Sequence, residues 1–138
     1  MSGDGMSSVE IADWLRSHFP DFDRLMALEA IAPGRATVRY RIGQRQLRPG
    51  GTVMGPAMML LADTAMYAAL LGADRRATRA VTSQLNISFL RRPPPRDLLA
   101  DAEVLRIGRQ LSVGEVRLRT EGEEAVVAHA TVTYSHPP

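Results

Sequence analysis

The sequence predicts an α+β domain in which a mostly antiparallel sheet surrounds one long helix. A single long apolar stretch, Val53 to Leu71, lies among six shorter runs of extended character, and segments rich in Pro, Gly or charge separate those runs. A helix about 10 to 12 Å across cannot cover both faces of a six-stranded sheet. We therefore expect the sheet to curve strongly around the helix and to use a remaining edge or face for oligomerisation.

The N-terminal part predicts a short helix followed by a hairpin. Ser7 or Ser8 can cap an amphipathic helix that runs to about His18. The Pro33–Gly34 pair then separates two extended runs and indicates a turn between them. These two strands are expected at Leu25 to Ala32 and Arg35 to Ile42.

The long apolar stretch predicts the central helix. Gly55 and Pro56 indicate its start, because proline is favoured at the first helical position, where its missing N–H costs nothing. We expect the helix to run to Leu71 and to stop at Gly72. Its apolar surface extends nearly all the way round, so other elements should cover it on most sides.

Four more strands are predicted after the helix. In the last one, Val126, Ala128, Ala130, Val132 and Tyr134 alternate with more polar neighbours, which is typical of a strand with one buried face. The breaks are a proline-rich segment, a Gly-Arg pair and an acidic segment around Gly122. The expected ranges are Ala80 to Leu90, Leu98 to Ile107, Leu111 to Thr120 and Ala125 to Tyr134.

Composition predicts one domain over residues 1–138 and excludes several kinds of chemistry. The chain has no cysteine and no lysine, which excludes thiolate nucleophiles, disulfides, Schiff bases and a phosphate-loop lysine. A net charge of +2, with arginines scattered among acids, argues against nucleic acid as a partner. The apolar stretch is interrupted by polar residues, so no membrane partner is expected, and the N-terminus does not resemble a secretory signal, which predicts a cytoplasmic location.

Asp63 is the first candidate functional residue. It lies inside the predicted helix, where the residues three and four positions away are Met59, Leu60, Met66 and Tyr67. No local cation can offset the desolvation of its carboxylate. Either catalysis or a purely structural bond to backbone amides or to Arg48 would explain the residue.

Four motifs give the chain a family resemblance. They are GTVMGP at the start of the helix, the LAD step that contains Asp63, NISFLRRP in the following strand, and the Gly108–Arg109 pair. In order and spacing they resemble the hotdog-fold acyl-CoA thioesterases of the PaaI-like family, which is related to phenylacetate degradation. The resemblance covers the chain from about Leu25 to Tyr134.

The resemblance implies a hotdog fold and an active site between the subunits of a homodimer or of a dimer of dimers. Asp63 would act as general base or nucleophile, and the Gly55 amide would bind the oxyanion. Thr82 would assist the attacking water. Because Asp63 lies about 12 Å along the helix from Gly55, the two groups of one subunit cannot hold one carbonyl, which agrees with a shared site.

Two departures from the family pattern bear on activity. Met54 replaces the usual His, and a thioether cannot donate a hydrogen bond or transfer a proton. Pro56 replaces the second Gly. Met54 and Met59 could line an acyl pocket or simply pack in the core. Arg48, which stands where some members have Asn, could pair with Asp63 or with a substrate carboxylate.

Polar residues that could hold the rest of the substrate follow the helix. Thr82, Gln84, Asn86 and Ser88 are expected on one face of their strand, with Asn86 as a candidate substrate contact. Phosphates of coenzyme A would bind arginine side chains through charge-assisted hydrogen bonds. The candidates are Arg91, Arg92, Arg106 and Arg109.

The sequence therefore predicts an acyl-CoA thioesterase that needs no cofactor, since coenzyme A belongs to the substrate. The three histidines lie far apart without ligand spacing, so no metal is expected. A non-catalytic acyl-CoA or fatty-acyl binding protein is the first alternative, because Met54 replaces the His. A hotdog hydratase is the second, but its Asp/His pair is not apparent.

Overall fold

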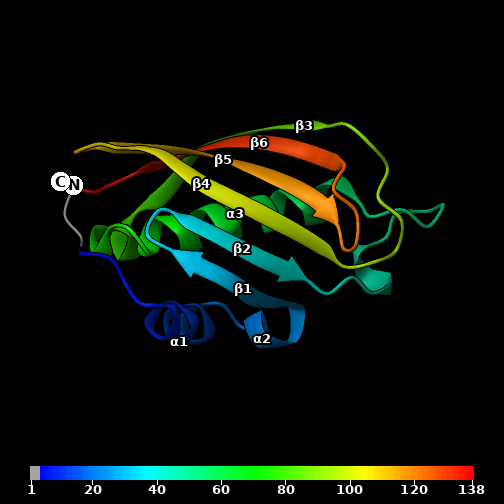
Figure 1. Cartoon of the computed structure of the whole chain (residues 1–138), viewed down its shortest axis with the longest axis horizontal. Helices are drawn as coiled ribbons and strands as arrows, with labels where there is room; N and C mark the ends of the chain where they lie inside the picture. Colours follow the sequence, from blue (N-terminus) through cyan, green and yellow to red (C-terminus); the bar gives the residue numbers. More distant parts are fainter. Residues whose placement is uncertain (1–3) are drawn as a thin grey trace.

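One curved sheet and the helix inside it form the body of the protein (Figure 1). The computed structural model describes residues 4–138. Six strands lie in the order β1-β2-β4-β5-β6-β3, and all neighbours are antiparallel. The strands are β1 (Met26–Ala32), β2 (Arg35–Tyr40), β3 (Val81–Phe89), β4 (Leu98–Ile107), β5 (Leu111–Thr120) and β6 (Val126–Ser135). This architecture confirms the predicted fold class, and the predicted strand ends differ by at most two residues.

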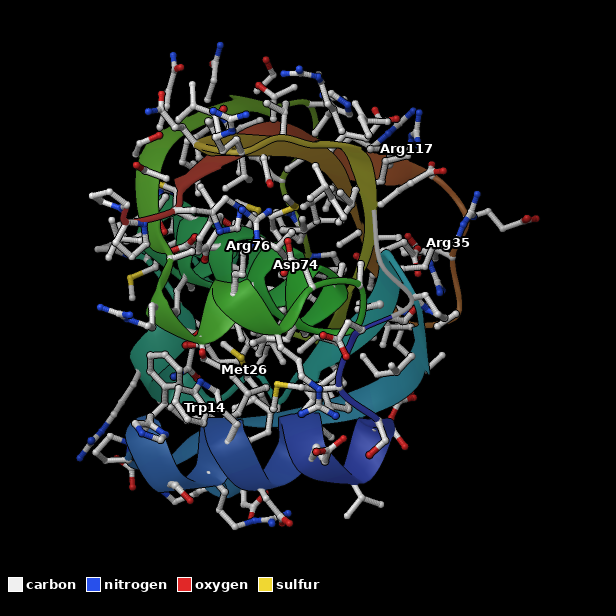
Figure 2. The ribbon with its side chains drawn as sticks, turned by 90° about the vertical axis from the view of Figure 1, so that its left-hand side faces the viewer. Trp14, Met26, Arg35, Asp74, Arg76 and Arg117 are labelled. Carbon is white, nitrogen blue, oxygen red and sulfur yellow. The ribbon has the colours of Figure 1, made fainter. Side chains whose placement is uncertain are left out.

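The central helix α3 (Gly55–Leu71) has the predicted ends. Figure 2 shows it between the arch of the sheet and the N-terminal helix. Most of its side chains are buried, as its all-round apolar surface predicts. Gly114 in β5 permits the close approach of helix and sheet, because a Cβ there would lie 2.4 Å from Met66 Sδ. In residues 4–138 no helix is both long and apolar enough to cross a membrane.

Helix α1 (Ser8–His18) confirms the predicted N-terminal helix. Ser7 and Glu10 form a reciprocal capping box, which fixes its first turn. Ile11 and Leu15 are fully buried, so the helix packs firmly on the body. Trp14 Nε1 donates a hydrogen bond of 3.0 Å to the Tyr67 hydroxyl of α3.

Short helical segments were not expected from the sequence. Helix α2 (Phe22–Leu25) follows Asp21, which has a left-handed φ of 71°, so the chain turns sharply and starts a new helical turn. As a result β1 begins at Met26 rather than Leu25. Two 3-10 turns, η1 (Gln44–Gln46) and η2 (Arg75–Arg79), precede and follow α3.

The two edges of the sheet are built differently. At one edge, α1 and α2 pack against β1. At the other edge, β3 is exposed along most of its length, with Val81 63% and Phe89 48% exposed. Leu90, just beyond the strand, is also exposed. A long, bare and partly apolar edge strand is a surface suited to pairing with another strand.

A β-bulge in β3 changes which side chains share a face of this strand. Thr82 pairs with Tyr134 and Gln84 pairs with Thr133, so the register shifts at Ser83. One extra residue reverses the alternation of side chains. Thr82 therefore points to the inner, helix-facing side, whereas Gln84, Asn86 and Ser88 point to the outer side. The prediction that all four share a face was wrong.

Candidate functional site

Asp63 lies near the middle of α3, on the flank that faces β3, and is partly exposed. Its Oδ1 accepts two hydrogen bonds, each 2.8 Å long, from Thr82 Oγ1 and from the Tyr134 hydroxyl. No arginine within residues 4–138 forms an ion pair with it. The carboxylate is thus held by hydroxyl groups and not by an arginine.

The bulge at Ser83 brings Thr82 to this carboxylate. Without the shift, Thr82 would share the outer face with Asn86, remote from α3. Because the Thr82 hydroxyl donates its hydrogen bond to Asp63, the lone pairs of its oxygen stay available to accept a hydrogen bond from water. Asn86 lies on the outer face, opposite Thr131, so one subunit does not bring it to Asp63.

Tyr134 is the member of the site that the sequence did not assign. It ends the inward-facing row of β6 and is only 4% exposed. Burial, reinforced by the charge of Asp63, raises the pKa of Tyr134 well above its usual range. The phenol therefore remains a proton donor at neutral pH. A signal was available: Tyr134 is the one phenol in an otherwise apolar row of alternating residues.

The second candidate group is the amide of Gly55 at the start of α3. The preceding Met54 offers no side-chain cap, and the following Pro56 has no N–H. No described group accepts a hydrogen bond from the Gly55 N–H. The Phe89 ring lies over Gly55, with Cζ 3.3 Å from where a Cβ would be. This N–H is therefore free to bind an anionic oxygen at the positive end of the helix dipole.

One subunit does not bring Asp63 and Gly55 together. Eight residues of helix separate them, which is about 12 Å along the axis. Their neighbours on β3 are also apart, since Thr82 and Phe89 lie near opposite ends of that strand. Surface cavities of about 230 to 440 Å³ lie elsewhere on the described residues, lined by neither Asp63 nor Gly55.

The surface of α3 between these two groups is apolar. Met59 and Leu60 are 41% and 48% exposed, although the helix is otherwise largely buried. Met54 is partly buried, and its N–H donates to Gln46 O. Arg48 is exposed in the preceding turn. The suggested Arg48–Asp63 ion pair is absent from the described subunit, where Arg48 precedes the Gly55 end of α3 and Asp63 lies about 12 Å further along the helix.

The arginines proposed for phosphate binding fall into two groups. Arg91 and Arg92 follow β3 at its Phe89 end. Arg106 lies near the end of β4, and Arg109 lies in the β4–β5 turn that follows. Pairing of Ser112 with Tyr134, and of Tyr134 with Thr82, puts this turn at the Asp63 end of the sheet. All four side chains are exposed. A single subunit does not gather them at one point.

Arg76 holds the β4–β5 turn that carries Arg109. The Arg76 guanidinium donates to the main-chain oxygens of Gly108 and Arg109, at 3.0 and 3.1 Å, and pairs with Asp74 (Figure 2). Arg76 lowers the pKa of the Asp74 carboxyl against the opposing effect of burial. In residues 4–138 no three His, Cys, Asp or Glu side chains gather as metal ligands.

Comparisons with known proteins agree with this architecture. A protein of Silicibacter sp. TM1040, described provisionally as a thioesterase, is 40% identical; the match covers 98% of this chain and 97% of that one, with a TM-score of 0.84. The phenylacetic acid degradation protein PaaI of Thermus thermophilus is 25% identical over 86% and 99% of the two chains, with a TM-score of 0.72.

Sequence comparison leads to the same group of proteins. A Halobacterium salinarum protein, described provisionally as an esterase, is 29% identical, and the match covers 88% of this chain and 85% of that protein. The pattern of the thioesterase superfamily matches residues 50–127, more than half of the chain, and includes α3 and β3 with Asp63, Gly55 and Thr82. The chain therefore belongs to the thioesterase superfamily.

Proposed function

We propose that this protein hydrolyses an acyl-CoA thioester to the free acid and coenzyme A. The observation that carries the proposal is the Asp63 carboxylate, which is held through Oδ1 by Thr82 and Tyr134 and has no counter-cation in the described subunit. Its Oδ2 accepts no hydrogen bond from the described residues and can act on water or on the thioester. Family membership and the free Gly55 amide support the same reaction.

We further propose that two copies of the chain build each site. Thr82 adjoins Asp63, and Phe89 adjoins Gly55, at opposite ends of the exposed edge strand β3. If two β3 strands pair antiparallel about a two-fold axis at Asn86, Leu85 lies opposite the partner subunit's Ile87, and the extra residue Ser83 brings Thr82 opposite the partner subunit's Phe89. Asp63 then approaches the partner subunit's Gly55, and two equivalent sites form.

In such a site the reaction needs few groups. Asp63 takes a proton from a water molecule while the oxygen of that water bonds to the carbonyl carbon. The Thr82 oxygen accepts a hydrogen bond from the water's other O–H. The resulting oxyanion is stabilised by the partner subunit's Gly55 N–H and its helix dipole. Collapse of this intermediate breaks the C–S bond, and the departing thiolate receives the proton from Asp63. Direct attack by Asp63 to form a mixed anhydride, which water then hydrolyses, is the alternative chemistry.

The same arrangement suggests how substrate binds. The apolar surface at Met54, Met59 and Leu60 is suited to an apolar acyl group. Antiparallel pairing would bring the partner subunit's Arg91 toward the Asp63 end of β3, on the side of the β4–β5 turn that carries Arg109. Arginines from two subunits could then bind the phosphates of coenzyme A. We expect a homodimer or a dimer of dimers.

The test is a hydrolysis assay over aryl, short-chain and medium-chain acyl-CoA esters, with release of free thiol as the readout. We expect at least one ester to be cleaved well above background. Asp63→Asn should lose at least about 100-fold in kcat and still bind substrate. Asp13→Asn, which changes an exposed carboxylate of α1, is the matched control and should retain activity. If the wild-type protein cleaves no ester in the panel, the proposal fails.

A non-catalytic acyl-CoA binding protein is the second candidate, because Met54 replaces the family histidine. It predicts binding of the same esters without release of thiol. Met54→His distinguishes the two functions further, since it restores a hydrogen-bond donor beside Gly55. In an enzyme that is limited by this substitution, kcat should rise; in a protein that only binds, the variant should remain inactive.

A further inference from the structure

The two oxygens of the Asp63 carboxylate have different surroundings. Oδ1 receives both hydroxyl hydrogen bonds, from Thr82 and Tyr134, whereas Oδ2 receives none from residues 4–138. The two donors also differ. Thr82 is on the exposed edge strand, where its small hydroxyl can rotate toward water. Tyr134 is almost fully buried, on a strand with neighbours on both sides.

Tyr134 is fixed on several sides. Strand pairing places it between Ser112 of β5 and Thr82 of β3. Its ring stacks on that of Tyr67, with centroids 5.6 Å apart and planes at 14°. The Tyr67 hydroxyl is in turn bound by Trp14 of α1. The Tyr134 hydroxyl also lies 3.2 Å from the main-chain oxygen of Asp63. The phenol thus spans the carboxylate and the helix backbone that carries it.

The Tyr134 hydroxyl is a hydrogen-bond donor as long as it keeps its proton. Burial and the nearby carboxylate raise the pKa of Tyr134, so the phenol keeps its proton at neutral pH. The ionisable side chains near the Asp63 carboxylate are the phenols of Tyr134 from β6 and Tyr67 from α3 itself. Neither is charged at neutral pH, and no cation of the described residues competes for Oδ1.

We propose that Tyr134 is a positioning residue that holds Oδ1 of Asp63 and thereby leaves Oδ2 as the oxygen that reacts. The inference rests on the proposed function of Asp63. A free carboxylate would rotate about its last torsion and exchange its two oxygens. A fixed donor on Oδ1 prevents this exchange, so that Oδ2 remains aimed at the exposed flank between α3 and β3.

Tyr67 supplies a matched control. It is buried and aromatic like Tyr134 and belongs to the same stacked pair, but its hydroxyl binds Trp14 and not Asp63. Tyr134→Phe and Tyr67→Phe each remove one buried hydroxyl and keep the ring. A purely structural role for Tyr134 predicts similar, small effects of the two changes on turnover. A positioning role predicts that they differ.

The first measurement is steady-state hydrolysis of the best ester from the panel. We expect Tyr134→Phe to lower kcat by about 10- to 100-fold, as for loss of a hydrogen bond to a charged group, with KM within about twofold of wild type. Tyr67→Phe should keep kcat within about threefold. Equal kcat values for the two variants, or an effect of Tyr134→Phe on KM alone, would overturn the inference.

The second measurement does not need activity. In protein labelled with ¹³C at aspartate carboxyl groups, the Asp63 resonance is identified by its loss in Asp63→Asn. At neutral pH that resonance should move in Tyr134→Phe and stay in place in Tyr67→Phe. A resonance unmoved in Tyr134→Phe would contradict the hydrogen bond itself. If no ester is cleaved but the resonance moves, the proposed function fails while the hold of Tyr134 on Asp63 stands.

Discussion

The two edges of the sheet show how one fold separates stability from assembly. Helices α1 and α2 pack against the β1 edge, and Ile11 and Leu15 of α1 are fully buried. The β3 edge has no such cover in the described subunit, and it carries Thr82 at the carboxylate and Phe89 at the free amide. The difference is the basis of our proposal that another copy of the chain completes the β3 edge, whereas α1 and α2 of the same subunit pack at the β1 edge.

The largest effect is expected when two inactive variants are combined in one dimer. Asp63→Asn removes the base, and Gly55→Pro removes the amide donor at a position where Met54 already has the extended backbone that a following proline needs. Each variant alone should lose at least about 100-fold in kcat. Co-expressed with different tags, they should recover about a quarter of wild-type activity, because half of the dimers contain one intact site.

The mixed dimers must be shown directly by purification through both tags. If these dimers form and remain inactive, the β3 edge does not bring Asp63 to the partner subunit's Gly55. Activity recovered only in the doubly tagged fraction would support a site shared between subunits.

The second test compares burial at the two edges. Leu15 lies on the buried face of α1, and Leu15→Ala should lower the free energy of unfolding by about 2 to 5 kcal/mol. Val81 is 63% exposed on β3, so Val81→Ala should change the stability of the isolated subunit by less than about 0.5 kcal/mol. Urea unfolding followed by circular dichroism, at concentrations where the protein is monomeric, measures both. Similar losses of unfolding free energy in the two variants would contradict the proposed difference between the two edges.

A third test places a charge on each edge. Asn86 and Ala30 are both exposed, on β3 and β1 respectively. Asn86→Lys would put like charges close together across a β3–β3 contact and should raise the dimer dissociation constant by roughly five- to tenfold. Ala30→Lys should leave it unchanged. Sedimentation equilibrium distinguishes these outcomes, and weakening by Ala30→Lys instead would move the interface to β1.

The smallest expected effect is one of pH. His136, just after β6, is buried, and desolvation together with the nearby Arg76 lowers its pKa. A histidine whose folded pKa is depressed contributes stability that is present above its unfolded pKa, about 6.5, and is lost as the pH falls below it. The urea midpoint should therefore be lower at pH 5.5 than at pH 7.5.

On the β1 side, the pKa of Glu10 is lowered to about 2 by its hydrogen bonds with Arg75 and Ser7, so this carboxylate stays ionised throughout that range. His136→Gln should reduce the drop in the urea midpoint between the two pH values. If the drop is the same in wild type and variant, His136 is not its cause.

Much of the fold could be predicted from sequence because its boundaries are marked by backbone chemistry. Gly55 and Pro56 mark the start of α3, and the Gly108–Arg109 pair marks the turn between β4 and β5. Helix α2 was missed because it follows the left-handed conformation of Asp21, and although aspartate is enriched in that conformation, the residue type alone does not mark where it occurs. Phe22, the first residue of this short helix, is buried in the folded chain, and local sequence does not reveal that contact.

The candidate site was predictable only in part. Asp63 was evident as a carboxylate in an apolar helix, but its partners depend on strand register. The bulge at Ser83 turns Thr82 inward and leaves Asn86 outside, and strict alternation cannot anticipate an inserted residue. Tyr134 looked like a core residue because its ring is one. Its hydroxyl gains a role from the helix that crosses beneath it.

The hydrogen bond between Trp14 and Tyr67 also gives the protein a built-in optical probe. Trp14 is the chain's single tryptophan, so its fluorescence arises from one place, the contact between α1 and α3. Tyr67 is near enough to transfer excitation to the indole, and the His18 ring stacks on the indole with centroids 3.8 Å apart. Detachment of α1 should therefore change the emission even while the sheet remains folded, which separates local opening from global unfolding in one unlabelled sample.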